Sequence, residues 1–375
     1  MTHVAIIGAG FGGLTAARTV RRQLPEAEIT LISPAKDFIF YPSLVWVPTD
    51  LRRGEDLRIP LDSFMDRHRV THHAGHVTGL RDKGRVVETD TGEVPNDALI
   101  IASGGRFIDK PGGTENVHTI CKGIESAEAI RRDLHALKRG HLAFGFATNP
   151  DEPGAMRGGP MFELLFGIDT WLRRQGRRDN FDITFFCPAP RPGARLGEKA
   201  VDGLLKDMHK RGIHAHVGHK LTGFEQGKVG SEGGDFDADL IAFMPGMTGP
   251  DWAENTDLPL SAGSMIQGDE YCRVPGFPGV YVVGDAGSFP GPDWMPKQAH
   301  QADLHAKAAA RNVTRELTGN QADTQYKPEL MCIIDTYDKG ALVYRGPNRG
   351  LVLPTIKPFH WAKQIFEKLY LRGIR

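Results

Sequence analysis

The sequence predicts an α/β fold in which two Rossmann-like, three-layer domains precede a C-terminal α/β segment that ends in an amphipathic helix. Three observations support this fold. A glycine-rich loop, residues 8–13, separates an apolar run from an Ala/Arg-rich helix. A second strand–loop–helix pattern begins at His141, and a further apolar strand occupies residues 279–283.

The order of these elements predicts one domain inserted into another. His3–Ile7, a helix from about Leu14 and a strand at residues 28–32 form a βαβ unit. We assign residues 1–140 plus 240–317 to the first dinucleotide-binding domain, in which Leu240–Met244 is a returning strand. Residues 141–239 form the inserted second Rossmann-like domain, and residues 318–375 form the C-terminal segment.

Composition excludes several classes of protein. The 46 basic residues balance the 46 acidic ones, so no overall field favours nucleic acid. The first residues run straight into a strand without a signal-peptide pattern, and no run of about 18 apolar residues is present, so we expect synthesis in the cytoplasm without a signal peptide. The four cysteines have neither disulfide-scaffold nor zinc spacing. The histidines at 68, 72, 73 and 76 lack carboxylate support, and we expect no metal.

The loop at residues 8–13, GAGFGG, fits GxGxxG in the context that gives this motif its meaning. Gly8 permits the tight turn, Gly10 lets the backbone approach a pyrophosphate, and Gly13 lets helix and strand pack closely. The helix from about Leu14 directs N–H groups and the positive end of its dipole at the phosphates. Ser33 stands where an acidic residue ordinarily binds the ribose.

Two further motifs indicate FAD. The strand and turn around Ala102, Ser103 and Gly104 look like the segment that follows the crossover in two-dinucleotide flavoproteins. Gly284 and Asp285 follow an apolar strand and look like the second flavin motif, in which an aspartate binds the ribityl chain. By contrast, the loop near Phe144 contains prolines and acids, which bind a pyrophosphate poorly, so we do not expect NAD(P)H to bind the second domain.

Nearly the whole chain resembles sulfide:quinone oxidoreductases and their near relatives, the flavoprotein subunits of flavocytochrome c sulfide dehydrogenases. The resemblance rests on the glycine loop and on several short motifs further along the chain. These are residues 38–43 (FIFYPS, with Pro42) and Trp46, residues 118–121, residues 158–160 with Glu163, Pro245, residues 284–285, Pro296 with Lys297, and Cys332.

The resemblance implies an FAD enzyme that oxidises sulfide or a related sulfur species and passes the electrons to a membrane quinone. It implies that Cys332 lies over the reactive flavin ring and that Cys121 lies near its dimethylbenzene side. The sequence leaves open whether Cys121 is covalently linked to FAD. Glu163 would be a buried carboxylate for proton handling. Lys297 would lie near the pyrimidine end of the flavin, where a cation stabilises the reduced anion.

One position departs from the family pattern. Arg157 stands where the second catalytic cysteine is expected, and arginine can neither form a disulfide nor carry a persulfide. We expect Arg157 to lie near Cys332 and to favour its thiolate. Two alternatives therefore stay open: an FAD oxidoreductase acting on a non-sulfur substrate, and a non-catalytic flavoprotein that carries electrons or senses redox state with a protein partner.

The last helix predicts a peripheral position on the inner, cytoplasmic membrane. Ala362, Ile365, Phe366 and Leu369 recur at helical spacing. Cationic side chains flank this apolar stripe, and we assign to that flank Lys363, Lys368, Arg372 and Arg375. The alternative is a helix packed on its own core. The sequence leaves open a homo-oligomer and the type of quinone.

Overall fold

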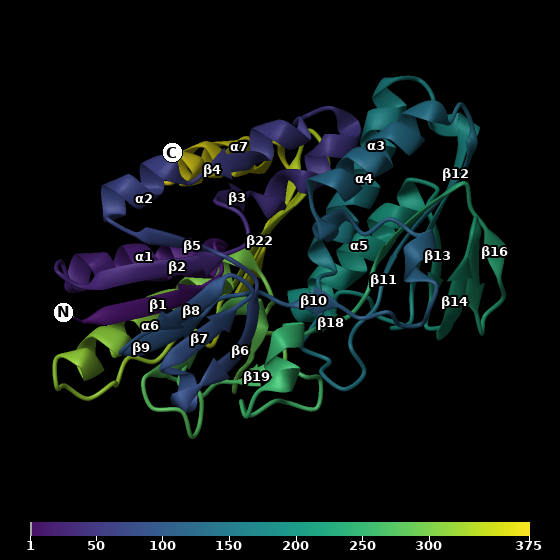
Figure 1. Ribbon diagram of the computed structural model, residues 1–375. Helices are drawn as coiled ribbons and strands as arrows, with labels where there is room; N and C mark the ends of the chain where they lie inside the picture. The colour runs from purple at the N-terminus through teal and green to yellow at the C-terminus, as the bar shows by residue number, and fades with distance from the viewer. Residues whose placement is uncertain (1) are drawn as a thin grey trace.

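The computed structural model describes residues 2–375, and its two largest sheets, both parallel, lie side by side in Figure 1. The first sheet has the strand order β20-β9-β1-β2-β5, and all its pairs are parallel. The predicted α/β class is thereby confirmed. The strands of this sheet are β1 (His3–Ile7), β2 (Glu28–Ser33), β5 (Thr71–Ala74), β9 (Ala98–Ile101) and β20 (Val280–Val282).

The first sheet is the middle of three layers because β1 is buried on both faces. Val4 and Ile6 pack against the helices α1 (Phe11–Gln23) and α6 (Ala299–Leu317). Ala5 and Ile7 face the opposite side, where they meet Val87 and the rest of a small antiparallel sheet. That sheet is made of β6 (Val77–Arg81), β7 (Val86–Thr89) and β8 (Gly92–Pro95).

The second sheet has the strand order β13-β12-β11-β17 and is also parallel. Its strands are β11 (Gly140–Phe146), β12 (Phe181–Cys187), β13 (His214–Val217) and β17 (Leu240–Met244). The assignment of Leu240–Met244 to the first domain is therefore wrong. This strand pairs with β11, and the side chains of both strands enter the same two apolar clusters, one on each face of the sheet.

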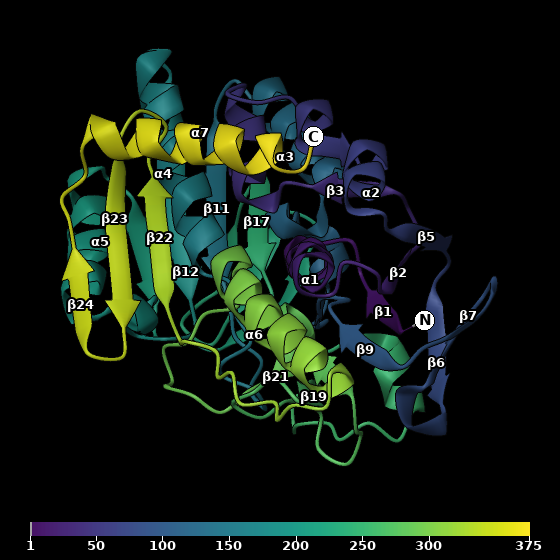
Figure 2. The same ribbon diagram turned by 90° about the vertical axis from the view of Figure 1, so that its left-hand side faces the viewer.

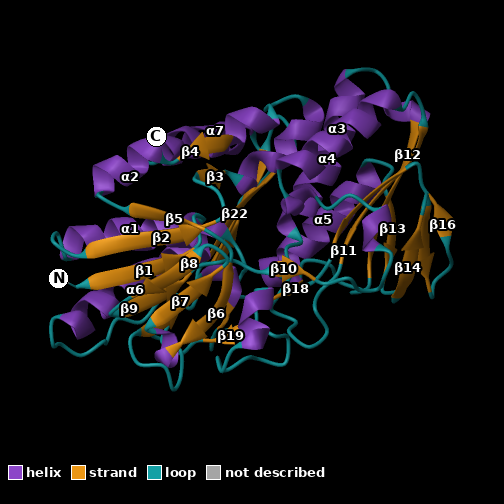
Figure 3. Cartoon of the chain, in the orientation of Figure 1, coloured by secondary structure: helices purple, strands orange, loops and turns teal. Residues whose placement is uncertain are grey.

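Layers of helix and strand cover the second sheet as well. The helices around it are α3 (Ile124–Ala136), α4 (Gly159–Arg174) and α5 (Glu198–Lys210). On the other face lie β14 (Leu221–Glu225), β15 (Lys228–Ser231) and β16 (Phe236–Asp237). Figure 3 shows the same alternation of helix and strand by colour. Before the C-terminal segment, the chain also forms one short helix and six short strands. These are α2 (Asp62–His68), β3 (Asp37–Ile39), β4 (Arg58–Pro60), β10 (Arg106–Phe107), β18 (Met247–Thr248), β19 (Ile266–Gln267) and β21 (Gly287–Ser288).

The C-terminal segment is an antiparallel sheet with one helix lying over it (Figure 2). It contains β22 (Leu330–Asp335), β23 (Gly340–Gly346), β24 (Arg349–Val352) and α7 (Lys357–Arg372). Helix α7 contacts β22 and β23, whereas Trp361, Ile365 and Leu369 are each more than half exposed. Within residues 2–375, no helix has the length and apolar character needed to cross a membrane.

Candidate active site

The glycine loop brings two of the predicted segments into contact. Gly8 has φ +104°, and a Cβ there would lie 2.3 Å from the carbonyl oxygen of Ala102. A Cβ on Gly13 would lie 1.8 Å from the carbonyl oxygen of Gly8. Only glycine satisfies both approaches. The result is that Ala102 and Ser103, at the end of β9, lie directly against the start of α1.

This site fits a dinucleotide. Helix α1 begins at Phe11, so its first N–H groups have no partner within the helix. A Cβ on Gly10 would meet nothing within 4 Å, which leaves the backbone open to a phosphate. The Oγ of Ser103 and the Oδ1 of Asp285 are buried without a hydrogen-bond partner. Buried polar atoms of this kind require a partner, which ribityl and pyrophosphate groups supply.

The other predicted cofactor contacts are placed as follows. Gly104 follows β9 with φ +76°, and a Cβ there would be in open space. Pro42 is the second residue of a 3-10 helix, Tyr41–Thr49, that packs against α3 and α4. The Oγ of Ser33 is already engaged, because it donates to the carbonyl oxygen of Ala35 at 2.8 Å and lies 3.0 Å from Nε2 of His72.

Arg157 joins the two predicted FAD-side residues Asp285 and Cys121. Its guanidinium donates to Oδ2 of Asp285, and its side chain is 22% exposed. Burial would lower the pKa of Arg157, but the charges of Asp285 and Cys121 and the hydrogen bonds to both together outweigh it and the pKa is raised, so the cation persists. Burial raises the pKa of the Cys121 thiol, and Arg157 beside it opposes this only in part. Asp285 keeps Oδ1 for another donor.

The expected pairing of Arg157 with Cys332 is wrong. Cys332 lies on β22 near the start of α4, where a Cβ on Gly159 would be 3.8 Å from its Sγ. The charged neighbours of Cys332 are Glu163 and Lys363. Burial and the carboxylate of Glu163 raise the pKa of Cys332 to about 12, and Lys363 lowers it only partly. The thiol is therefore protonated at neutral pH instead of being held as a thiolate.

A buried ion pair lies beside Cys332. Glu163, on α4, is 8% exposed and accepts a hydrogen bond from Nζ of Lys363. The placement of Lys363 on an outward cationic flank is wrong, since it too is only 8% exposed. Burial raises the pKa of Glu163 from 4.5 to about 7, although the cation of Lys363 opposes the shift. A carboxyl group with this pKa exchanges a proton at neutral pH.

Sequence reasoning missed a polar network that continues from this pair under α7. Asp335 accepts hydrogen bonds from Nε1 of Trp46 at 3.0 Å and from Nδ1 of His360 at 2.7 Å. Hydrogen bonding from His360 and the charge of Lys363 lower the pKa of Asp335 despite its burial. His360, Lys363 and Glu367 recur at helical spacing on the inward side of α7. That polar stripe is a signal in the sequence that could have revealed the network.

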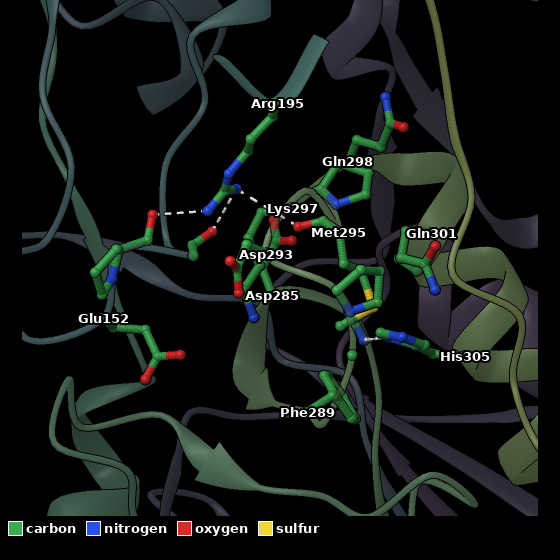
Figure 4. A pocket seen from close by; sticks show the side chains of 17 residues that line it. Glu152, Arg195, Asp285, Phe289, Asp293, Met295, Lys297, Gln298, Gln301 and His305 are labelled. Carbon is green, nitrogen blue, oxygen red and sulfur yellow. Dashed lines mark hydrogen bonds between the residues drawn. The ribbon is translucent and has the colours of Figure 1, made fainter. Parts of the chain in front are cut away.

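Lys297 lines a cavity of about 510 Å³ between the two sheets' loops (Figure 4). Its Nζ donates to the carbonyl oxygen of Gly287, and burial lowers its pKa to about 8. Arg195, which lines the same cavity, donates to the carbonyl oxygens of Gly154 at 2.8 Å and Pro153 at 2.7 Å. Asp285 lines the same cavity, so Lys297 and Asp285 share one site.

The fold and site define the class of protein. The model of the family described as pyridine nucleotide-disulphide oxidoreductase matches residues 2–144 and 170–306. The chain belongs to this family and is an FAD-dependent oxidoreductase. Among residues 2–375, no group of three or more His, Cys, Asp or Glu side chains is arranged to hold a metal ion.

Comparison with individual proteins shows which members of this family the chain is similar to. The chain is 25% identical to the sulfide-quinone reductase of Aquifex aeolicus, over 100% of this chain and 91% of that protein. It is also 25% identical to the type II NADH:quinone oxidoreductase Ndh of Mycobacterium tuberculosis, over 84% of this chain and 73% of that protein. The crystal structure of the sulfide:quinone oxidoreductase from Aquifex aeolicus has the same fold, with a TM-score of 0.90, 24% identity, and coverage of 100% and 92%.

Proposed function

We propose that this flavin oxidoreductase oxidises a small reduced sulfur species and passes the electrons to a quinone in a membrane. The observation that carries the proposal is the Glu163–Lys363 pair, which lies beside Cys332 and under the outward-facing apolar side of α7. Quinone reduction consumes protons as well as electrons. A carboxyl group with a pKa of about 7, under a lipid-facing helix, is suited to supply one.

The residues around the dinucleotide site divide the remaining work. FAD supplies the two-electron chemistry when it is bound. Gly10, the start of α1 and Ser103 would hold its phosphate region, and Asp285 would hold the ribityl chain. Lys297 would place a cation where negative charge develops on the ring system. Arg157 keeps Asp285 and Cys121 together and neutralises the carboxylate between them.

The sulfur donor reacts at Cys332: a bond between its Sγ and the donor sulfur would form as each loses a proton, and the two electrons released would go to FAD as the oxidant. Cys121 is enclosed with Arg157 at the Asp285 side, whereas Cys332 lies at the Glu163 side, beside a group that can take or give a proton. Anaerobic titration with sulfide tests this assignment. Wild-type protein and the Cys121→Ser variant should lose their yellow colour at near-stoichiometric sulfide, and Cys332→Ser should keep it. Cys187→Ser, changed in the core of β12, is the matched control.

A second candidate function is oxidation of a non-sulfur donor. It is favoured by the protonated Cys332 and by Arg157, which leaves Cys332 without a cysteine partner; all four cysteines are free thiols. Sulfide-dependent bleaching that is unchanged in Cys332→Ser, or bleaching only by other donors, would favour this candidate. NADH and NADPH should leave the flavin oxidised, because residues 147–158 carry prolines and acids in place of a glycine loop.

We also propose that α7 attaches the protein to the surface of a membrane. Trp361, Ile365 and Leu369 are 55%, 56% and 63% exposed and project from one side of the helix. Deleting the helix would also remove the buried Lys363, so point substitutions are the cleaner test. The double variant Trp361→Ser/Leu369→Ser should bind vesicles about tenfold more weakly while it retains FAD. Unchanged binding would indicate that α7 is not the attachment site.

A further inference from the structure

A second cavity, of about 660 Å³, opens beside α7 on the surface of the molecule. Helix α7 contributes Lys368 and Arg372 to its lining, and Arg375, three residues beyond the end of the helix, contributes a third cation. Arg52 and Asp56, which follow the 3-10 helix at Tyr41–Thr49, form the other side. None of these residues belongs to the flavin site or to the proposed reaction.

The charges in this cavity do not cancel. Arg52 is paired with Glu367 at 2.8 Å, and Glu367 also accepts a hydrogen bond from Ser43, so this pair is fixed within the wall. Lys368, Arg372 and Arg375 are exposed, and none of them forms an ion pair with a described residue, 2–375. Asp56 is the one other acid in the lining. Three cations and one carboxylate therefore favour an anionic ligand.

The position of the cavity identifies the kind of anion. Lys368 is adjacent in the chain to Leu369, and Arg372 follows it by one helical turn, so the cations border the exposed apolar side of α7. A phospholipid has both matching parts, with an anionic phosphate next to acyl chains. At a membrane surface, the headgroup phosphates lie at the level of the cations that flank an apolar helix face.

We propose that this cationic pocket, lined by Arg52, Lys368, Arg372 and Arg375, binds the headgroup of an anionic phospholipid. The inference rests on the proposed attachment of α7 to a membrane and adds a lipid preference to it. Occupation of the pocket would orient α7, because the headgroup fixes one flank of the helix while Trp361 and Leu369 enter the lipid. The Glu163–Lys363 pair would then lie on the side of α7 away from the bilayer.

Co-sedimentation of the full-length, FAD-loaded protein with two kinds of vesicle tests the proposal. One kind contains only phosphatidylcholine, and the other also contains anionic phosphatidylglycerol. The pocket variant Lys368→Gln/Arg372→Gln should bind the anionic vesicles about thirtyfold more weakly and the neutral vesicles as well as wild type does. The matched control, Arg349→Gln/Lys357→Gln, removes two exposed cations near the apolar residues Leu351 and Ile356. It should lose only a fewfold.

The outcomes separate the two proposals. Wild-type protein that binds neither kind of vesicle would refute membrane attachment, and the lipid site with it. Equal binding to both kinds would keep the attachment and overturn the headgroup site. Equal losses in the pocket and control variants would show diffuse attraction instead of a site. Release by inorganic phosphate, with ionic strength matched by chloride, would make free phosphate the ligand and overturn the assignment to lipid.

Discussion

Between β1 and α1 the chain turns within Gly8, Ala9 and Gly10, whereas between β11 and α4 it uses residues 147–158. Both connections join a parallel strand to a helix at the same end of a sheet. The short connection offers its backbone to a ligand, because its glycines allow close approach and leave the first N–H groups of α1 open. The long connection makes its contacts through side chains.

The side chains of the long connection reach the first domain. Arg157 donates to Asp285, and Glu152 accepts a hydrogen bond from Ser288 at 2.9 Å. Helix α4 then presents Glu163 to Lys363. The comparison teaches that a βα unit without a phosphate-binding glycine loop can instead supply charged groups to the dinucleotide site of the neighbouring domain.

The largest effect is expected from Gly13→Val in the short connection. A Cβ there would lie 1.8 Å from the Gly8 carbonyl oxygen, so the loop cannot form and FAD should be lost entirely. Gly10→Ala is the matched control, since its Cβ would meet no atom of the protein within 4 Å. It should fold normally and bind FAD about tenfold more weakly, because a methyl group enters the phosphate space. Flavin absorbance and FAD titration of the flavin-free protein measure both.

Asp285→Ala tests the ion pair that joins Arg157, in the long connection, to the first domain. It leaves the cation of Arg157 without its partner in a largely buried place, which should lower the free energy of unfolding of the flavin-free protein by about 3 kcal/mol. Adding Arg157→Met should recover much of that loss. Asp293→Ala, an exposed acid on the same cavity, should change little. Urea denaturation measures all three; a full loss in Asp293→Ala would contradict the account.

Glu163→Gln should remove a pH dependence. Burial raises the pKa of Glu163 from 4.5 to about 7, so the folded protein holds its proton over that range while the unfolded chain does not. This contribution to stability is full below about pH 4.5 and is lost as pH rises through about 7. The variant should flatten the stability curve there and reduce quinone turnover about 100-fold. Asp335→Asn removes a neighbouring negative charge that helps to raise the pKa of Glu163, so it should move that window toward lower pH.

Local features of the fold were predictable from the sequence. The glycine loop and the apolar strands expected at residues 3–7 and 28–32, observed as His3–Ile7 and Glu28–Ser33, depend on short-range pattern. The pairing of the strands could not be predicted from the sequence. Leu240–Met244 is buried on both faces, and its apolar sequence does not indicate which of the two sheets it joins. Its pairing with β11 is set by tertiary packing.

The candidate site was predictable where a motif places a residue, as for Gly8 and Asp285. Pairings between distant residues were not. Lys363 fits the outward pattern of α7, and only the buried Glu163, 200 positions earlier, draws it inward. Arg157 was assigned to Cys332 from its position in the motif, yet the free carboxylate of Asp285 attracts it instead. Both errors concern long side chains, whose direction is decided by the nearest opposite charge.

The most direct test of the central claim is single-turnover oxidation of the reduced protein by a quinone. The bound flavin would be photoreduced without oxygen and mixed with a short-chain ubiquinone in a stopped-flow instrument. The account predicts rapid return of the oxidised flavin absorbance, slowed about 100-fold in Glu163→Gln. Flavin that stays reduced in the presence of quinone, yet is reoxidised when another acceptor is added, would contradict it.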